Sequence, residues 1–482
     1  MSAEKQYIDL YRSQKDLINA HSAPALNALR EEAARQLGCL GLQRPHDFSH
    51  VDPEQLLAAD YSLNLARHTV PLGQEGPFTC TVPELSTNVH FLTNEQYTGT
   101  TDKVADDSYY AGSLREFAVS HPEVMQQYYN RLAGSRLDTG DPRSAGYTAC
   151  SPGESALNTM LCQDGFVLYV PDGVQVKRPL QLISLLRSVE DFMAVQRLLV
   201  LIGKHASASL LVCEHASLLP KTAEDGQPLV QTETDGRAAY VYPDLLSLQT
   251  TEIFVEEDAS LQFYSLQDHH AHAHRLGQIY LSQQRGSEVD LGQYALNVGQ
   301  TRNRVQVALD GPGAQVRLYG MATLDAAQRL DNITFVDHRV PDCQSSELFR
   351  YTLDGQAKGS FLGRILVRKG SDRTDASQTS RNLCLSPEAR MIARPELEIY
   401  ADDVKCSHGA TVGQLDRQAL FYMCTRGIPE EEARMLLKFA FMADVIEGIR
   451  IEPLKVRLKS LVEKRFRGEL ERQCRSCSNT TI

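Results

Sequence analysis

The sequence predicts a mainly β protein whose core is a stacked parallel β-solenoid, with helical regions before and after it. Two observations lead to this prediction. From about Gly165 the chain repeats one unit: an alternating run of apolar and polar residues, a short turn that usually contains Gly, Asp or Ala, and a second alternating run. Before this part, and again after Gly427, apolar residues recur at helical spacing. Short strands with turn signals between them indicate an all-β core, and the recurring strand-turn-strand phrase favours stacked coils over a sandwich.

Residues 1–155 are predicted to form a mostly helical region. Apolar residues recur at helical spacing in residues 4–19 and 23–37, and the second helix is expected to end at Gly38. A turn-rich stretch with Pro45, Pro53, Pro71, Pro77 and Pro83 follows, and helical spacing returns in residues 113–119 and 122–132. No chemistry can be read from this region.

Residues 156–420 are predicted to form the solenoid. The repeated unit is clearest in residues 168–182, 201–212, 253–264, 287–297, 307–320 and 399–412. Each coil of a solenoid buries its inward face on its neighbours, so the two ends of the stack need caps. The helical regions at the two ends of the chain are expected to be those caps. A sandwich or barrel is the structural alternative.

Residues 421–482 are predicted to be helical. Glu430, Glu431 and Glu432 suit the positive end of a helix dipole, and an apolar stripe follows them. A last helix over residues 453–467 is rich in Lys and Arg. The pattern alone favours a solvated face for these charges.

Composition excludes some classes of function. A net charge of -12 argues against nucleic acid as a partner, because binding phosphates needs a basic surface. No apolar run approaches the about 18 residues of a spanning helix, and MSAEKQYIDLYRSQKD lacks the apolar core of a signal peptide. The 11 cysteines are scattered, and many lie in apolar runs, as Cys162, Cys213, Cys384 and Cys424 do. This usage predicts reduced, buried thiols in a cytoplasmic protein without a membrane segment.

The most informative candidates for function are Cys406 and His408, two residues apart in a strand-like run. Side chains repeat every two residues in a strand, so the thiol and the imidazole leave the same face and can approach one metal. Both suit iron–sulphur clusters, zinc or copper. Two ligands do not complete a site, and no other Cys or His lies within ten residues. The remaining ligands would come from a distant segment or another chain; the alternative is a buried thiol beside a hydrogen-bonded imidazole.

Three other clusters attract attention. The run His269–His274 would place His270, His272 and His274 on one face of a strand, a geometry that suits zinc or nickel. Cys213 and His215 repeat the spacing of the main pair, and Cys474 and Cys477 form a lone Cys-x-x-Cys near the chain end. We favour a solvated histidine cluster at a coil edge, a buried core thiol at Cys213 and a mobile tail over metal sites.

The chain shows no complete active site, and no catalytic residue is assigned. It has no Gly-x-x-x-x-Gly-Lys-Ser/Thr phosphate loop, no Gly-x-Ser-x-Gly elbow and no His-Glu-x-x-His helix. Two readings from other classes stay open. One is a β-helix enzyme acting on carbohydrates, which needs acidic groups in a groove; the other is a solenoid that binds proteins and never touches metal.

The segment around Cys406 carries a resemblance to a known family. It reads ADDVKCSHGATVG at Ala401–Gly413, followed by ALFY at Ala419–Tyr422 and Arg-Gly-Ile at Arg426–Ile428, with SQTSRN and GFVLYVPDGVQVKRPL upstream. These segments resemble the SufB/SufD family of the SUF iron–sulphur cluster assembly scaffold. The SufD branch fits better than SufB, which has Glu-Ala-Thr where this chain has Gly409, Ala410 and Thr411, and which usually bears an N-terminal cysteine cluster.

The resemblance implies a right-handed parallel β-helix and a non-catalytic scaffold subunit. Its expected partners are a SufB-like paralogue and a SufC-like ATPase of the ABC type, which docks on the C-terminal helices; a homodimer is expected when the paralogue is missing. His408 matches the histidine that helps to hold a transient iron–sulphur cluster where the two paralogues meet, and Cys406 matches the neighbouring cysteine. Reduced flavin is linked to the assembled complex, but no residue of this chain can be assigned to it.

Overall fold

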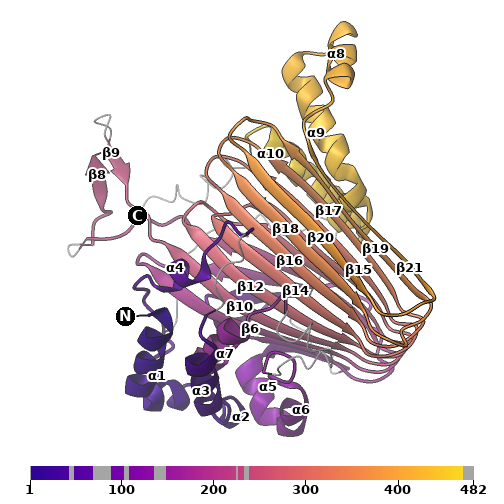
Figure 1. Cartoon of the computed structure of the whole chain (residues 1–482). Coiled ribbons are helices and arrows are strands. Elements are labelled where there is room, and N and C mark those ends of the chain that lie inside the picture. Colours follow the sequence, from indigo (N-terminus) through magenta and orange to yellow (C-terminus); the bar gives the residue numbers. More distant parts are fainter. Residues whose placement is uncertain are drawn as a thin grey trace.

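The computed structural model describes residues 2–42, 48–68, 88–101, 108–134, 148–223, 226–232 and 238–469. Two large sheets face each other, and helices lie outside them (Figure 1). The helices of the first part of the chain are α1 (Ala3–Ala20), α2 (Pro24–Asn27), α3 (Arg30–Leu40), α4 (Pro53–Leu57), α5 (Leu114–Ser120), α6 (Pro122–Tyr128) and α7 (Pro152–Leu161). The helices of the last part are α8 (Arg417–Thr425), α9 (Glu430–Glu447) and α10 (Glu452–Phe466).

The strands of the two large sheets alternate along the chain. The first sheet has ten strands in the order β2 (Gln96–Thr100), β1 (Asn88–Thr93), β5 (Leu180–Leu186), β7 (Ser207–Ala216), β11 (Ser260–Asp268), β13 (Glu288–Asn297), β15 (Gln315–Leu324), β17 (Gln344–Leu353), β19 (Thr374–Cys384), β21 (Val404–Gly413). The second has nine strands in the order β20 (Arg390–Ile399), β18 (Lys358–Val367), β16 (Arg329–His338), β14 (Gln300–Leu309), β12 (Ala273–Gln283), β10 (Leu245–Val255), β6 (Phe192–Ile202), β4 (Phe166–Val170), β3 (Tyr110–Ser113). A separate hairpin joins β8 (Val230–Thr232) to β9 (Ala238–Tyr240).

From β4 onward the neighbouring strands of both large sheets are parallel, and consecutive strands lie in opposite sheets. Each coil therefore stacks directly on the one before it, as in the pairing of β10 with β12, which runs without a break from Leu245 opposite Ala273 to Val255 opposite Gln283. The predicted parallel β-solenoid is confirmed.

The interior lies between the two sheets, and alternation decides which side chains enter it. In β19, Thr374, Ala376 and Gln378 are buried, whereas Asp375 and Arg381 are exposed. One apolar cluster, which includes Leu261, runs through most of the coils. The corners between strands need residues with positive φ. Gly286 has φ 65°, and a Cβ there would collide with the Asp258 carboxylate of the previous coil.

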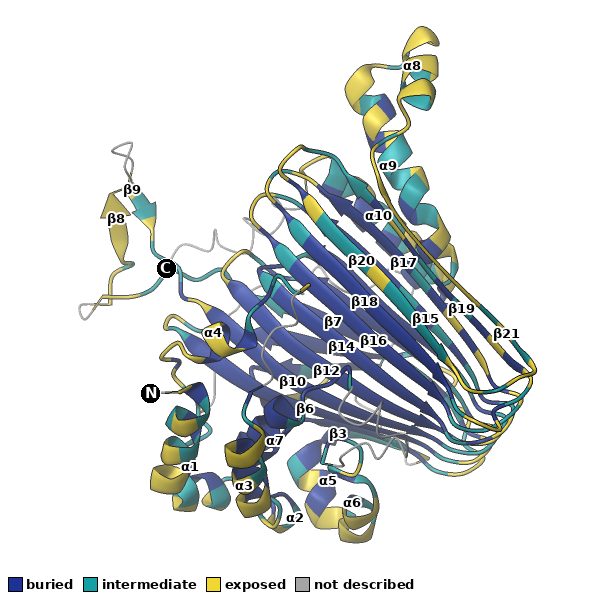
Figure 2. Cartoon of the chain, in the orientation of Figure 1, coloured by how far each residue is buried: buried dark blue, intermediate teal, exposed yellow. Residues whose placement is uncertain are grey.

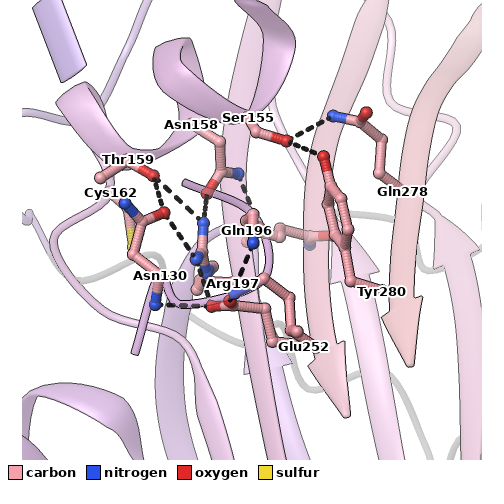
Figure 3. A network of polar contacts seen from close by, with 12 residues as sticks. Asn130, Ser155, Asn158, Thr159, Cys162, Gln196, Arg197, Glu252, Gln278 and Tyr280 are labelled. Carbon is pink, nitrogen blue, oxygen red and sulfur yellow. Dashed lines mark hydrogen bonds and ion pairs between the residues drawn. The ribbon is translucent and has the colours of Figure 1, made fainter. Parts of the chain in front are cut away.

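The N-terminal region packs against the outer face of the nine-stranded sheet and is held there by buried polar groups (Figure 3). Arg197 Nη2 lies 2.5 Å from Glu252 Oε2, and both side chains are fully buried. Glu252 also accepts backbone N–H groups from Asn130, Leu132 and Ala133. Asn158 of α7 donates to the carbonyls of two strands, at Gln196 and Leu248. A buried charge is tolerated only when it is paired in this way.

Some predictions for the N-terminal region were wrong in detail. The second predicted helix is interrupted between Asn27 and Arg30, and it continues past Gly38 to Leu40; Gly41, with φ 64°, follows its last residue. Strands β1, β2 and β3 were not predicted, because short strands beside prolines lack a clear alternation. They extend the two sheets beyond the first full coil. Apart from Pro53, the prolines of the turn-rich stretch lie outside the described residues.

The C-terminal helices lie on the outer face of the ten-stranded sheet. Residues of α9 and α10, among them Met442, Ile446 and Leu458, share an apolar cluster with outward residues such as Cys213 and Tyr264. Helix α8 has no buried residue, and with the start of α9 it projects beyond the sheets (Figures 1 and 2). The prediction that these helices cap the solenoid was therefore wrong, and they leave the last coil uncovered. No helix in the described ranges is long and apolar enough to span a membrane.

Candidate functional site

The last coil forms an open end of the solenoid. Strands β20 and β21 are the outermost strands of the two large sheets. No residue of either strand is buried, whereas their neighbours differ: β18 is almost entirely buried, and β19 is buried at its inward positions (Figure 2). The described parts of the chain therefore leave both the outer backbone edges and the interior of this coil accessible.

Cys406 and His408 both lie in β21, on the face that points into the solenoid. Cys406 packs against the apolar interior cluster, and its neighbour in β19 is the buried Ala376. His408 lies two residues further along, opposite the buried Gln378, and it is exposed because β21 is the outermost strand of its sheet. Strand alternation thus directs a thiol and an imidazole toward the interior at the open end of the solenoid.

The thiol of Cys406 is held in its neutral form by its surroundings. Partial burial raises the pKa of Cys406, the Asp375 carboxylate raises it further, and the backbone N–H of Ala376 opposes both effects. A metal binds the thiolate, so iron would have to displace the proton. Among the residues that the structure describes, no group of three or more His, Cys, Asp or Glu side chains is arranged to hold a metal ion.

In the coils before this open end, the interior contains a row of polar side chains that the sequence analysis missed. Gln378 Nε2 donates to Glu347 Oε1 over 2.9 Å, and Thr334 Oγ1 donates to Glu347 Oε2 over 2.6 Å. Burial raises the pKa of Glu347 to about 7. The signal was present in the sequence, because Gln378 and Glu347 occupy inward positions of alternating runs. Inward positions in a solenoid are normally apolar, so a polar residue at one of them is a signal.

The edge strands β20 and β21 have features that are typical of an interface. Pro395 lies within β20, where a residue without an N–H group is tolerated because the strand is at an edge. Exposed apolar side chains lie on or next to the two edge strands: Ile399 is 41% exposed, Tyr400 38% and Val412 49%. A long edge strand with exposed apolar side chains can pair with a strand of another chain, and exposed apolar patches often mark interaction sites.

The projecting helices form a separate exposed surface. Phe421 and Tyr422 of α8 are 71% and 58% exposed, and Leu436 of α9 is also exposed. The Arg426 guanidinium lies over the Tyr422 ring, 5.1 Å from its centroid. Aromatic and Arg side chains of this kind are enriched at protein interfaces.

The predicted histidine cluster is divided between a turn and a strand, although His272 and His274 both lie near Asp244 Oδ1, at 3.1 and 3.9 Å. His270 and His272 lie in the turn before β12, and only His274 belongs to the strand, so the prediction that all three share one strand face was wrong. His272 Nδ1 lies 3.1 Å from Asp244 Oδ1, and this contact raises the pKa of His272. Burial lowers the pKa of His270 to about 4.

The other cysteines give mixed outcomes. Cys213 is buried under the C-terminal helices, as predicted, and burial raises its pKa to about 12. Cys162 is also buried, but Cys384 is only half-buried and Cys424 is exposed, so the prediction of burial was wrong for Cys424. The described cysteines form no disulfide. Cys474 and Cys477 lie outside the described residues.

The fold and the site together define a parallel β-solenoid subunit with an open terminal coil that presents a thiol and an imidazole. Residues 185–441 match the model described as SUF system FeS cluster assembly, SufBD core domain, and residues 1–182 match the SufBD protein N-terminal region. The chain therefore belongs to the SufBD family of iron–sulphur cluster assembly proteins. The resemblance drawn from the sequence is confirmed.

Individual relatives agree with this assignment. The chain is 28% identical to the iron–sulphur cluster assembly SufBD family protein slr0076 of Synechocystis, over 64% of this chain and 66% of that protein. It is 34% identical to the iron–sulphur cluster assembly protein SufD of Escherichia coli, over 35% of this chain and 40% of that protein. The aligned parts thus span less than two thirds of these two relatives. The SufD protein of Bacillus subtilis is 24% identical over 97% of this chain and 99% of its own length.

Proposed function

We propose that this chain is a non-catalytic scaffold subunit of iron–sulphur cluster assembly that pairs, through its open last coil, with a related solenoid of the SufB type. The uncovered coil is the observation that supports this most directly. The inward apolar residues Met391 and Leu397 need cover, because the end of a solenoid stack is stable only when capped. No described segment of this chain supplies that cover.

Pairing with a second solenoid would satisfy both edges at once. Strands β20 and β21 are each ten residues long and form the edges of their sheets, and an edge strand can pair with a further strand through its outward backbone groups. The matching last coil of a related subunit, turned by a two-fold rotation, would add an antiparallel strand to each sheet. Because paralogues share this edge, the chain can pair with itself when its partner is missing.

Such pairing explains the incomplete ligand set. Cys406 and His408 would supply two ligands at the joint, and the partner would supply the others. The cluster is cargo in this scheme rather than a resident cofactor. An incomplete set shared between two chains holds a cluster less firmly than a full buried set, and so favours its transfer. Reduced flavin, if it acts in the complex, has no assigned residue on this chain.

The surface of α8 and α9 suits a second partner. We assign it to an ATPase of the ABC type, similar to SufC, because this chain has no phosphate-binding loop and because Phe421 and Tyr422 are largely exposed on the projecting helix. ATP-driven movement of these helices would then open and close the shared joint. The free thiols fit a reducing compartment such as the cytoplasm.

The test is anaerobic cluster reconstitution on the chain co-expressed with its paralogue and ATPase. His408→Ala and Cys406→Ala are compared with Ser407→Ala, which alters an exposed residue on the outward face of the same strand. Loss of bound iron and of visible absorbance in the first two variants, with the complex intact on gel filtration, is the expected result. Equal iron content in all variants would indicate that the chain is a structural subunit that does not bind the cluster.

A further inference from the structure

The interior of the solenoid contains a buried acceptor without a donor. Gln378 is 1% exposed, and its Oε1 has no hydrogen-bond partner among the residues that the structure describes. Leaving a buried carbonyl unpaired costs about 1 to 3 kcal/mol. Native proteins rarely leave such a group unpaired, so a nearby side chain that can turn its N–H toward this oxygen is the expected partner.

Glu347 fixes which end of the Gln378 amide is left over. Glu347 accepts from Thr334 on one oxygen and from Gln378 Nε2 on the other. If the Gln378 amide were reversed, its oxygen would face the Glu347 carboxylate, and two acceptors would repel each other. The amide therefore turns its N–H groups toward Glu347, and its carbonyl oxygen is the free group.

The opposite sheet leaves room for this arrangement. Gly363 of β18 faces Gln378 across the interior, and a Cβ at Gly363 would meet the Gln378 amide, lying 2.8 Å from its Cδ. A Cβ would also come within 2.7 Å of Phe361 Cζ. Any larger residue at this position would displace the amide, so the glycine provides the space in which Gln378 is oriented.

His408 is the residue directly opposite Gln378 on the open side of β19. Gln378 and His408 are direct partners in the pairing of β19 with β21, and alternation turns both toward the interior. Adjacent strands lie about 4.8 Å apart, which is within reach of a hydrogen bond between two long side chains. We propose that Gln378, oriented by Glu347, accepts an N–H from the His408 ring and so fixes which ring nitrogen is free to bind the cluster. This inference rests on the proposed function of His408.

The chemical consequence follows from the imidazole itself. A neutral ring has one N–H donor and one nitrogen with a lone pair, and only the lone pair can bind iron. Donation to Gln378 keeps the proton on the nitrogen that faces the interior and leaves the lone pair on the other nitrogen. Gln378 and Glu347 are thus positioning residues, and Glu347 acts through Gln378.

The test reads the tautomer of His408 in the cluster-free full-length chain. Nitrogen NMR of histidine-labelled protein, with His408 assigned by its loss in His408→Gln, distinguishes the two tautomers at a pH of about 8.5, where free imidazole is neutral. We expect one tautomer in the wild type and a mixture in Gln378→Met, which keeps the volume but removes the acceptor. Glu347→Met should also give a mixture, and Glu347→Gln, which keeps an acceptor oxygen, should restore one tautomer.

Asn382→Leu is the matched control. Asn382 is an inward, buried residue of the same strand, and it donates to Thr411 O over 2.9 Å, away from His408. This variant should lose stability without changing the His408 tautomer. A mixed tautomer in the wild type, or a tautomer that Gln378→Met leaves unchanged, would overturn the inference.

Cluster loading separates this inference from the proposed function. In the reconstituted complex, Gln378→Met should lower the affinity for iron about 10-fold to 100-fold, as the loss of a group that orients a metal ligand does. If His408→Ala leaves loading unchanged, the proposed function fails whatever the tautomer result. If His408→Ala abolishes loading while Gln378→Met changes neither loading nor tautomer, only the positioning role fails.

Discussion

Replacing Glu252 with glutamine is predicted to loosen the N-terminal region from the solenoid. The change leaves the Arg197 guanidinium fully buried without its counter-charge. Removing one partner of a buried ion pair costs about 3 to 5 kcal/mol. In the wild type the Asn130 N–H donates to Glu252 Oε2 over 2.8 Å. When the NH2 group of the introduced glutamine takes this place, two donors face each other, and the unpaired N–H costs about 1 kcal/mol or more.

The expected total of about 4 to 6 kcal/mol can be measured by hydrogen exchange. Each 1.4 kcal/mol is a factor of ten, so amides of α7 that open with this region should exchange about 10³ to 10⁴ times faster. Unfolding in urea, followed by the fluorescence of the 19 tyrosines because the chain has no tryptophan, gives an independent measure. Arg197→Met in the Glu252→Gln background should recover most of the loss.

Glu256→Gln provides the control for this prediction. Glu256 also contacts the N-terminal region, through the Tyr128 hydroxyl at 3.1 Å, but it lacks a buried ionic partner among the described contacts. Its replacement should cost about 1 kcal/mol at most. If Glu252→Gln accelerates exchange in α7 no more than Glu256→Gln does, the buried pair does not anchor this region and the reasoning is refuted.

Three further predictions concern the interior, the edge and the helices. Burial raises the pKa of Glu347 from its ordinary value of 4.5 to about 7, so the folded state holds the proton more tightly and stability falls as the pH rises through this window. Between pH 4.5 and about 7, the wild type should lose about 3 kcal/mol of its free energy of unfolding, and Glu347→Gln should not show this loss. Urea unfolding at several pH values measures it, and the same pH dependence in both proteins would contradict the prediction. Val412→Asp should abolish self-pairing and pairing with the paralogue in light scattering, because it places a charge on the open coil; retained pairing would exclude this edge as the interface. Phe421→Ser should prevent co-purification of the ATPase without changing Tm, since this side chain is 71% exposed; a lower Tm or unchanged co-purification would count against the docking surface.

The candidate pair could be found from the sequence because its signal is local. Two residues at i and i+2 in a strand share a face whatever surrounds them, so Cys406 and His408 are predictable as a pair. The histidine run 269–274 has the same local spacing, yet a turn before β12 separates His270 and His272 from the strand. Spacing predicts a shared face only where a strand forms, and the sequence does not fix where this strand begins.

The contact between Gln378 and Glu347 could not be found in this way, although each was visible as a polar residue at an inward position. Each is one polar residue in an alternating run, and their partnership depends on the register of successive coils, which places Glu347 opposite Gln378 and Gln378 opposite His408. The same limit applies to Arg197 and Glu252, which are separated by 55 positions along the chain. Register follows from coil length and corner conformation, and these are set by packing along the whole stack.

By itself the sequence determined the repeated strand units, the helical regions at both ends, the pairing of a thiol with an imidazole on one face and, through the resemblance, the family. Only the tertiary structure decided that the C-terminal helices lie on a sheet face and leave the last coil open. The physical reason is the range of the forces involved. Strand alternation and helical spacing express the geometry of neighbouring residues, whereas the open end depends on where distant apolar surfaces find each other to bury.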